Sequence, residues 1–156
     1  MEKHVVETFG NRLRVRASGL YWQDGRLLLV NHTGLGRPSF WAPPGGEIIF
    51  GQTAGHTVER EFLEETHLTV KCHRYLFAGE FINSPLHAIE LFFEVRHRAG
   101  NLRTGNDPET ESRVIKEVRL FTWPEILALP ESEKHGLFRY VTSADDLKNL
   151  TGFYRF

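Results

Sequence analysis

Residues 45–68 contain a glycine pair followed by a helical pattern that carries three glutamates on one turn. At 100° per residue, Glu61, Glu64 and Glu65 fall within about 100° of arc on one side of a helix. Like charges at this spacing destabilise an isolated helix by roughly 0.2–0.5 kcal/mol per pair. A hard divalent cation such as Mg²⁺ or Mn²⁺ turns the repulsion into coordination, because all-oxygen ligands suit these ions better than they suit Zn²⁺. The segment therefore predicts either a metal-binding helix or a solvated acidic helix face.

The residues around these glutamates favour the metal site, because they resemble the signature box of the Nudix hydrolases. That box runs Gly, five residues, Glu, seven residues, then Arg-Glu-apolar-any-Glu-Glu-any-Gly-apolar. Here Gly46 opens the box and Leu68 closes it, with Arg60-Glu61-Phe62 and Glu64-Glu65 at the matching positions. The preceding Trp41-Ala42-Pro43-Pro44-Gly45-Gly46 is similar to the family's usual lead-in.

Two positions depart from the family pattern. Gln52 stands where the family usually has Glu, and His67 stands where it usually has Gly. Gln keeps the length and the acceptor oxygen of Glu, so we expect residue 52 to brace the box rather than to perform the chemistry. A backbone with φ > 0 at residue 67 would strain His but not Gly. Neither departure removes a carboxylate, and we expect an active enzyme.

The resemblance implies a fold and an activity. The expected fold class is α/β, a Nudix-type α/β/α sandwich with a mixed β-sheet, and residues 1–156 are expected to form a single Nudix hydrolase domain. Its core is expected over residues 11–130, followed by a C-terminal helical segment over 131–156. The expected reaction cleaves the diphosphate linkage of a nucleoside diphosphate joined to another group. Mg²⁺ or Mn²⁺ would neutralise the phosphate oxygens and lower the pKa of the attacking water.

The resemblance also assigns the catalytic set, which consists of Arg60, Glu61, Glu64 and Glu65. The three glutamates and the backbone carbonyl of Gly45 would hold the metal, and Arg60 would orient the carboxylates. A further metal ligand often comes from outside the box, and Glu109 and Glu111 are the candidates. Plainer interpretations stay open: a surface ion pair worth under about 1 kcal/mol for Arg60, a tight turn at Gly45, and solvated side chains for the two loop glutamates.

Several residues outside the box are candidates for binding the substrate. Arg14 and Arg16 on the first predicted strand, and Arg37 in the loop before the box, could hold phosphates. Phe40, Trp41 and Phe81 could stack on a base, although such side chains more often belong to a core. Pro85, 17 positions after Leu68, weakly resembles the subgroup that acts on ADP-ribose. ADP-ribose, nucleotide sugars and nucleoside triphosphates all stay open as substrates.

The hydrophobic pattern predicts strands around one central helix. Leu13, Val15 and Ala17 alternate with polar residues, as in a strand whose apolar side is buried. The first half further contains these signals: a hairpin turn at Asp24-Gly25, a buried strand over 26–30, a long surface loop over 33–46, and a helix over Ala54–Thr66 capped by Thr53. The second half predicts strands over 68–81, 87–96 and 114–121, a polar loop over 97–113, a short helix over 125–129 after Pro124, and further helix within 134–150. Residues 151–156 are aromatic and indicate no role.

The composition fits one globular domain, with 156 residues, 40% hydrophobic and 25% charged. A net charge of −1 gives no reason to expect nucleic acid or a membrane surface as a partner. The single Cys72 excludes an internal disulfide. The chain lacks both a long apolar stretch and a hydrophobic signal core, so we expect a cytoplasmic protein. The expected partner is a small nucleotide-derived substrate, and a homodimer is left open.

A different class of function is a catalytically inactive Nudix-fold module that binds a ligand or regulates another protein. Such a module usually lacks a box carboxylate, whereas Glu61, Glu64 and Glu65 are all present. A DNA-binding regulator would need a further helical reader and a basic surface, for which 156 residues with a net charge of −1 leave little room. The sequence therefore favours the hydrolase.

Overall fold

A computed structural model of the chain describes residues 3–33, 38–104 and 115–156. Its elements follow one another in this order: α1 Lys3–Phe9, β1 Arg12–Leu20, β2 Trp22–Gln23, β3 Arg26–His32, β4 Trp41–Ala42, β5 Gly45–Glu47, α2 Ala54–Thr66, β6 Thr69–Asn83, β7 Leu86–Ala99, β8 Ile115–Phe121, α3 Trp123–Ala128, the 3₁₀ helices η1 Glu131–Glu133 and η2 Gly136–Tyr140, α4 Ala144–Lys148, and β9 Phe153–Arg155.

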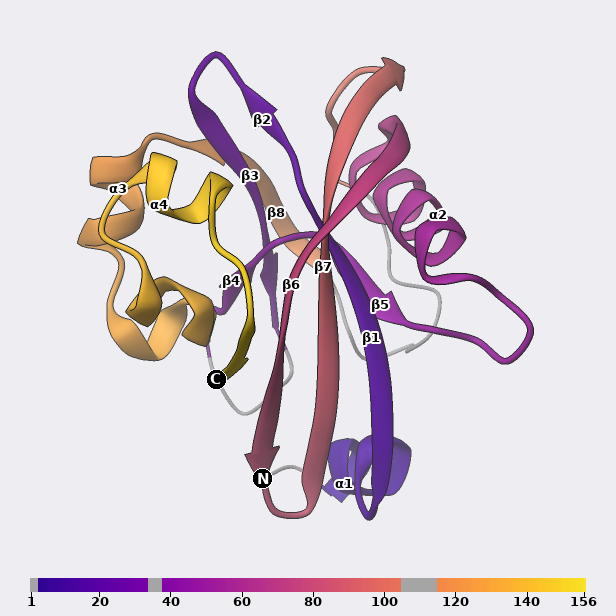
Figure 1. Cartoon of the computed structure of the whole chain (residues 1–156). Coiled ribbons are helices and arrows are strands. Elements are labelled where there is room, and N and C mark those ends of the chain that lie inside the picture. The colour runs from indigo at the N-terminus through magenta and orange to yellow at the C-terminus, as the bar shows by residue number, and fades with distance from the viewer. Residues whose placement is uncertain (1–2, 34–37, 105–114) are drawn as a thin grey trace.

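The strands form two sheets. One has five strands in the order β5-β1-β7-β6-β9, in which β1 pairs with β7 in parallel and β6 pairs with β9 in parallel. In the other, β3 pairs with β2, β4 and β8, all antiparallel. Helix α2 lies on one side of these strands, and α3 and α4 lie on the other (Figure 1). This arrangement confirms the predicted α/β sandwich with a mixed sheet.

Helix α2 begins and ends where the sequence predicts. The Thr53 side chain accepts a hydrogen bond from the backbone N–H of His56, which satisfies one of the free donors of the first turn. Val58 and Phe62 are fully buried against the sheet, in a cluster that includes Ala17. The helix ends at His67, whose φ of 60° is left-handed. Residue 67 therefore has the backbone conformation in which His is strained and Gly is not.

The Asp24-Gly25 turn connects β2 to β3 as predicted. Both residues have positive φ, 50° and 73°, which is the backbone geometry that twists a two-residue hairpin correctly. The apolar side chains of the following strand, Leu27 to Val30, are all fully buried.

The surface loop predicted over 33–46 is wrong for its second half. Residues 41–46 are buried and contain β4 and β5. The Trp41 ring packs edge-on against Phe121 with 4.7 Å between centroids, and Gly45 pairs with Ser18 of β1. Proline and glycine here mark close packing rather than solvent exposure, since a Cβ on Gly45 would lie 2.1 Å from the Ser18 hydroxyl.

The prediction that the apolar side of β1 is buried is also wrong for the start of this strand. Leu13 and Val15 are 53% and 40% exposed, whereas Arg14 is only 6% exposed. Arg14 can be buried because its Nε donates to Glu47 at 2.8 Å and its guanidinium lies 4.2 Å from the centroid of the Phe9 ring. Helix α1, which the sequence does not predict, supplies that ring. The face of β1 that carries the arginines is therefore covered.

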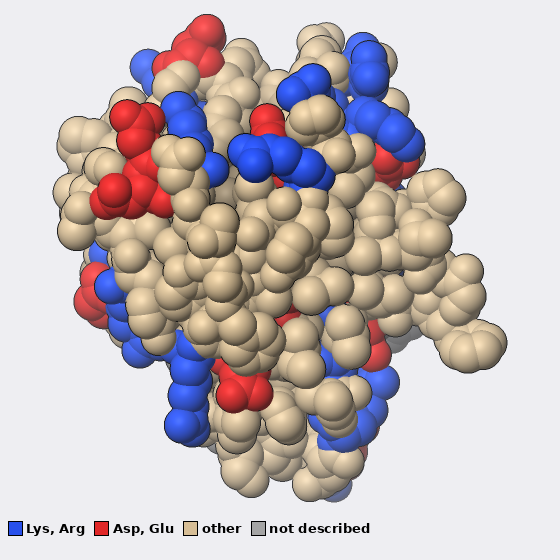
Figure 2. All heavy atoms as spheres, in the orientation of Figure 1, with Lys and Arg blue, Asp and Glu red and all other residues tan. Residues whose placement is uncertain are grey.

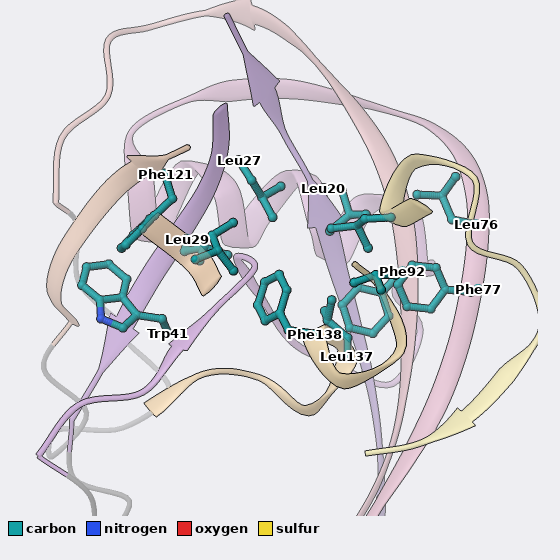
Figure 3. Close-up of a cluster of buried hydrophobic side chains, with 13 residues drawn as sticks. Leu20, Leu27, Leu29, Trp41, Leu76, Phe77, Phe92, Phe121, Leu137 and Phe138 are labelled. Atoms are coloured by element: carbon teal, nitrogen blue, oxygen red, sulfur yellow. The ribbon is translucent and has the colours of Figure 1, made fainter. Parts of the chain in front are cut away.

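The C-terminal part differs from the predicted helical segment. Residues 131–156 form short helices and then β9, which extends the five-stranded sheet beside β6. Leu137, Phe138 and Leu147 from this part enter the larger core cluster together with Phe77 and Phe92. Figure 3 shows this cluster, in which the Phe77 and Phe92 rings stack with 4.6 Å between centroids. The C-terminal elements thus pack against the sheet and close one side of the core.

The remaining predicted elements of the second half are confirmed with shifted ends. Strands β6 and β7 form a long hairpin that turns between Asn83 and Leu86, and β8 and α3 follow. Thr122 caps α3 in a reciprocal pair of hydrogen bonds with Glu125. None of the helices in the described part of the chain has the length and apolar character that a membrane crossing requires.

Candidate active site

Arg60 holds two of the three box glutamates in place. Its Nη2 lies 2.9 Å from the Glu61 carboxylate, and its Nη1 donates to Glu64 at 3.0 Å. The same guanidinium donates to the side-chain oxygen of Gln52 at 3.2 Å and to the carbonyl of Glu47 at 3.3 Å. A planar group with five fixed donors is suited to such convergent contacts. The geometry agrees with the orienting role expected for Arg60 and shows Gln52 as one of its supports.

The third box glutamate contacts the strand before the helix. Glu65 accepts a hydrogen bond from the backbone N–H of Gly45 at 3.2 Å and is only 1% exposed. Next to it, a Cβ on Gly46 would lie 2.1 Å from a carboxylate oxygen of Glu61. A glycine is thus required at residue 46 for β5 to approach the carboxylates.

A bound ion would be held by the box carboxylates. Within residues 3–33, 38–104 and 115–156, no three His, Cys, Asp or Glu side chains are grouped as a metal would need. Glu61 and Glu64 contact Arg60, which agrees with the orienting role expected for this arginine. The donors nevertheless fit Mg²⁺ or Mn²⁺, because they are all oxygens. The further candidates Glu109 and Glu111 lie outside the described residues.

Beside the box lies a cavity of about 380 Å³, which we name the sheet pocket, on the face of the five-stranded sheet that points away from α2. Its floor consists of two rows of side chains that run across three strands. One row is Arg14, Ala88 and Phe81, and the next is Arg16, Glu90 and Gly79. Ala88 is small and leaves space between larger neighbours, and Gly79 makes room for the ring of Phe156. The volume lies at the lower end of the range for small-molecule sites, roughly 300–1,000 Å³.

The sheet pocket brings together four of the residues predicted to bind substrate: Arg14, Arg16, Phe40 and Phe81. Trp41 does not line it, because its ring belongs to the core. Arg37 lies outside the described residues. The pocket thus combines cationic and aromatic side chains that are far apart in the sequence.

Arg16, Glu90 and His135 form a chain of polar contacts in the pocket. Arg16 donates to Glu90 at 3.1 Å, and the other Glu90 oxygen lies 3.3 Å from His135 Nε2. Burial alone would raise the pKa of Glu90, but His135 and Arg16 outweigh it and lower the pKa to about 2. Burial would likewise lower the pKa of Arg16, yet Glu90 raises it above its usual value. Both groups therefore remain charged at neutral pH.

Arg14 has donor capacity that the protein does not use. Its Nε binds Glu47, but its Nη2 is buried and has no hydrogen-bond partner among the described residues. Burial and the neighbouring Arg16 lower the pKa of Arg14 from its usual value. An unpaired buried donor on a charged group costs free energy, so this atom is suited to an acceptor oxygen on a ligand.

The pocket and the box are directly connected. Arg16 donates from Nη2 to the carbonyl of Gly45 at 3.3 Å, and the N–H of Gly45 binds Glu65. A ligand held by Arg16 would therefore reach the strand that contacts the box carboxylates.

The pocket residues missed from the sequence include Glu90, His135 and Phe156. A charged residue within the aromatic strand 88–95 was a signal for Glu90. His135 and Phe156 gave no local signal, because only the fold carries the C-terminal part back to β6 and β7.

Comparison with known proteins agrees with this geometry. A family model described as the NUDIX domain matches residues 10–141. A NUDIX hydrolase from Nitrosomonas europaea is 18% identical with a TM-score of 0.70, over 83% of this chain and 85% of that one. The MutT protein from Methanosarcina mazei Go1 is 18% identical with a TM-score of 0.68, over 83% and 90%. An ADP-ribose pyrophosphatase from Streptococcus suis is 19% identical with a TM-score of 0.59, over 90% and 98%.

No curated protein matches the chain. At these identities the solved structures show the fold alone, whereas the family model spans most of the sequence and includes the whole box. The chain therefore belongs to the NUDIX family of hydrolases.

Proposed function

We propose that this NUDIX enzyme hydrolyses the diphosphate linkage of a nucleoside diphosphate joined to another group, and that the reaction needs Mg²⁺ or Mn²⁺. The observation that carries the proposal is the contact of Arg60 with Glu61 and Glu64, at 2.9 and 3.0 Å, directly beside the Gly45-Gly46 strand. Burying Glu61 and Glu65 costs free energy that a merely solvated helix face would avoid. A role in holding an ion accounts for that cost.

We propose a separate role for each residue of the box. Glu61, Glu64, Glu65 and the Gly45 carbonyl would hold the ion, and Glu109 or Glu111 would be a further ligand. When bound, the ion neutralises phosphate oxygens and lowers the pKa of the attacking water. Arg60 orients the carboxylates, and the absence of side chains at Gly45 and Gly46 admits the diphosphate to the box.

The arginines of β1 would hold the phosphates and the group next to them. Arg16 contacts the Gly45 carbonyl, which places its guanidinium between the box and the pocket. Arg14 lies two residues further along the same face of β1 and offers its unused Nη2. Guanidinium groups bind phosphate oxygens through paired hydrogen bonds, so a diphosphate at the box can extend its substituent over Arg16 and Arg14.

The substrate is proposed to be of the ADP-ribose, nucleotide-sugar or nucleoside-triphosphate type. A pocket with arginines on one strand and aromatic rings opposite them suits a molecule with both phosphates and a ring. One matched structure bears the name ADP-ribose pyrophosphatase, which makes ADP-ribose the first compound to test.

The alternative is a Nudix-fold ligand-binding module without turnover. Such a module keeps the pocket but does not need the box. Here every box carboxylate is present: Glu61 and Glu64 contact Arg60, and Glu65 accepts from the Gly45 N–H. A screen for phosphate or nucleoside monophosphate release distinguishes the two. The wild type is incubated with ADP-ribose, nucleotide sugars and nucleoside triphosphates, with Mg²⁺, Mn²⁺ or EDTA, and Glu64→Gln serves as the blank.

We expect metal-dependent release from at least one compound by the wild type. Tight binding of a compound together with no release under any metal condition would instead support the binding module.

We also propose one domain, a cytoplasmic location and a small-molecule substrate as the main partner. A homodimer is worth testing by sedimentation velocity, because Phe50 is fully exposed and residues 48–58 contain no Lys, Arg, Asp or Glu. Figure 2 shows this projecting β5–α2 loop as an uncharged part of the surface.

A further inference from the structure

The segment that follows the matched family domain contributes a wall of the sheet pocket. The family model ends at residue 141, yet Phe156 lines the pocket. Strand β9 places it there by pairing with Ala78–Glu80 of β6, and the backbone N–H of Phe156 donates to the Glu80 carbonyl at 2.8 Å. The pocket of this chain is therefore completed by residues that the family domain does not supply.

Gly79 makes room for the Phe156 ring. A Cβ on Gly79 would lie 2.4 Å from two carbons of that ring, closer than any real side chain could be. Phe156 thus occupies the position above β6 that a side chain of residue 79 would fill. Phe81 lies two residues after Gly79 on the same face of β6, so their Cα atoms are about 6.8 Å apart.

The backbone of β6 repeats about every 6.8 Å on this face. A planar ring held between two others needs about 7–8 Å between the outer rings, which is two carbon contacts of roughly 3.5–4 Å each. Ala88 of β7, which is in register with Phe81, adds little side-chain bulk to the floor beside Phe81.

The wall continues through His135. Its Nδ1 accepts the backbone N–H of Leu137 at 3.0 Å, and its Nε2 lies 3.3 Å from a carboxylate oxygen of Glu90, so both ring nitrogens hold the ring in place. The His135 ring contacts Phe156 with 4.7 Å between centroids and Phe40 with 6.2 Å. Phe40, His135 and Phe156 therefore form one continuous wall of aromatic rings.

We propose that Phe156 is a specificity-determining residue that packs against the nucleobase of the substrate, with Phe81 on the other side of the base. The inference rests on the proposed function, because it states where the phosphates and the base of the proposed substrate bind. Phosphates lie toward Gly45 and Arg16, and the base lies over Ala88. An anionic group would favour the arginine side, whereas a flat, weakly polar ring gains from the aromatic wall.

Calorimetric titration without metal tests this assignment, because it needs no turnover. The probes are AMP, GMP, UMP and CMP, with ribose 5-phosphate as the probe that has no base. We expect the wild type to bind at least one nucleotide tenfold or more tightly than ribose 5-phosphate. Phe156→Ala and Phe156→Leu should weaken nucleotide binding by about tenfold, in keeping with the loss of one stacked ring, and leave ribose 5-phosphate binding unchanged.

Phe153→Ala is the matched control, because Phe153 lies on the same strand, is 60% exposed and does not line the pocket. It should bind all probes as the wild type does. The Leu variant keeps most of the apolar volume, so a loss of stacking is measured even if the Ala variant unfolds.

Three results would overturn the assignment. The wild type could bind the nucleotides no more tightly than ribose 5-phosphate, Phe156→Leu could bind nucleotides as tightly as the wild type, or the Phe156 variants could lose as much affinity for ribose 5-phosphate as for the nucleotides. If base-dependent binding by Phe156 is seen but no compound is hydrolysed with Mg²⁺ or Mn²⁺, the proposed hydrolysis fails and this assignment stands.

Discussion

The most informative single residue is Arg60, because its contacts explain why three glutamates can share one helix turn. It forms ion pairs with Glu61 and Glu64 and is itself supported by Gln52 and the Glu47 carbonyl. The sequence predicted the i, i+4 pair with Glu64, since helix geometry alone fixes it. The contacts with Gln52 and Glu47 depend on how the preceding loop folds back, which no local pattern determines.

The support from Gln52 leads to the first prediction. Its side-chain oxygen accepts from Arg60 at 3.2 Å and from the Thr57 hydroxyl at 2.9 Å. Gln52→Glu keeps both acceptor contacts and adds a charge, so kcat/KM should change by less than about tenfold, which is under 1.4 kcal/mol. Steady-state kinetics with the best substrate of the screen measures this. A gain of a hundredfold or more would show that Gln52 impairs the native box and would favour the binding module.

The second prediction concerns His67. Its φ of 60° is the left-handed conformation that costs a non-glycine residue roughly 1–2 kcal/mol. His67→Gly should therefore raise the free energy of unfolding by about 0.5–1 kcal/mol, after the greater chain entropy of Gly is subtracted. Urea denaturation measures the change, and His73→Gly in the middle of β6 should be destabilising instead. A destabilised His67→Gly variant would mean that the His side chain stabilises the helix end.

At the scale of elements, the predictable parts were those fixed by local pattern. Helix α2 follows from its Thr53 cap and its apolar stripe, and the β2–β3 hairpin follows from Asp24-Gly25. The start of β1 was assigned to the wrong face because apolar alternation does not reveal that Glu47 and Phe9 cover Arg14. Local sequence shows the period of a strand, whereas its buried face depends on partners elsewhere in the chain.

The third prediction concerns how Glu90 joins β7 to β1 and to the segment before η2. Its folded-state pKa of about 2 lies below its ordinary 4.5, so its stabilising contribution is present above pH 4.5 and is lost as the pH falls toward 2. The contribution is on the order of 3 kcal/mol. Unfolding measured across this range should show a steeper loss of stability in the wild type than in Glu90→Gln.

Glu94→Gln is the control for that comparison. Its ion pair with Arg74 is exposed on both sides and contributes little, so this variant should follow the wild-type profile. Parallel pH profiles for the wild type and Glu90→Gln would contradict the role given to Glu90.

At the scale of the whole molecule, the sequence predicted the fold and the box but not the pocket. Its four pocket candidates were arginines and phenylalanines chosen by residue type, and only the five-stranded sheet places them in neighbouring rows. The contribution of β9 could not be predicted, because parallel pairing with β6 joins residues more than 70 positions apart. Such contacts depend on topology rather than on local preference.

The fourth prediction tests whether the box binds metal in the folded protein. An ion at about 100 times its Kd adds roughly 2.7 kcal/mol of stability by mass action. For a chain of this size, that raises Tm by about 5–10 °C. Thermal melts with Mg²⁺, Mn²⁺ and EDTA should show the shift in the wild type and in Glu94→Gln, and a much smaller one in Glu61→Gln, Glu64→Gln and Glu65→Gln. An equal shift in all three box variants would place the ion elsewhere.

The most direct test of the central claim is turnover of the best substrate by the wild type, Glu64→Gln and Glu65→Gln at saturating Mg²⁺. All three proteins must first show cooperative thermal unfolding. The account predicts that either substitution lowers kcat by at least about a hundredfold, a barrier increase of roughly 2.7 kcal/mol, and that EDTA abolishes wild-type turnover. Turnover near the wild-type rate in either folded variant, or full activity in EDTA, would contradict the claim that these carboxylates hold a catalytic ion.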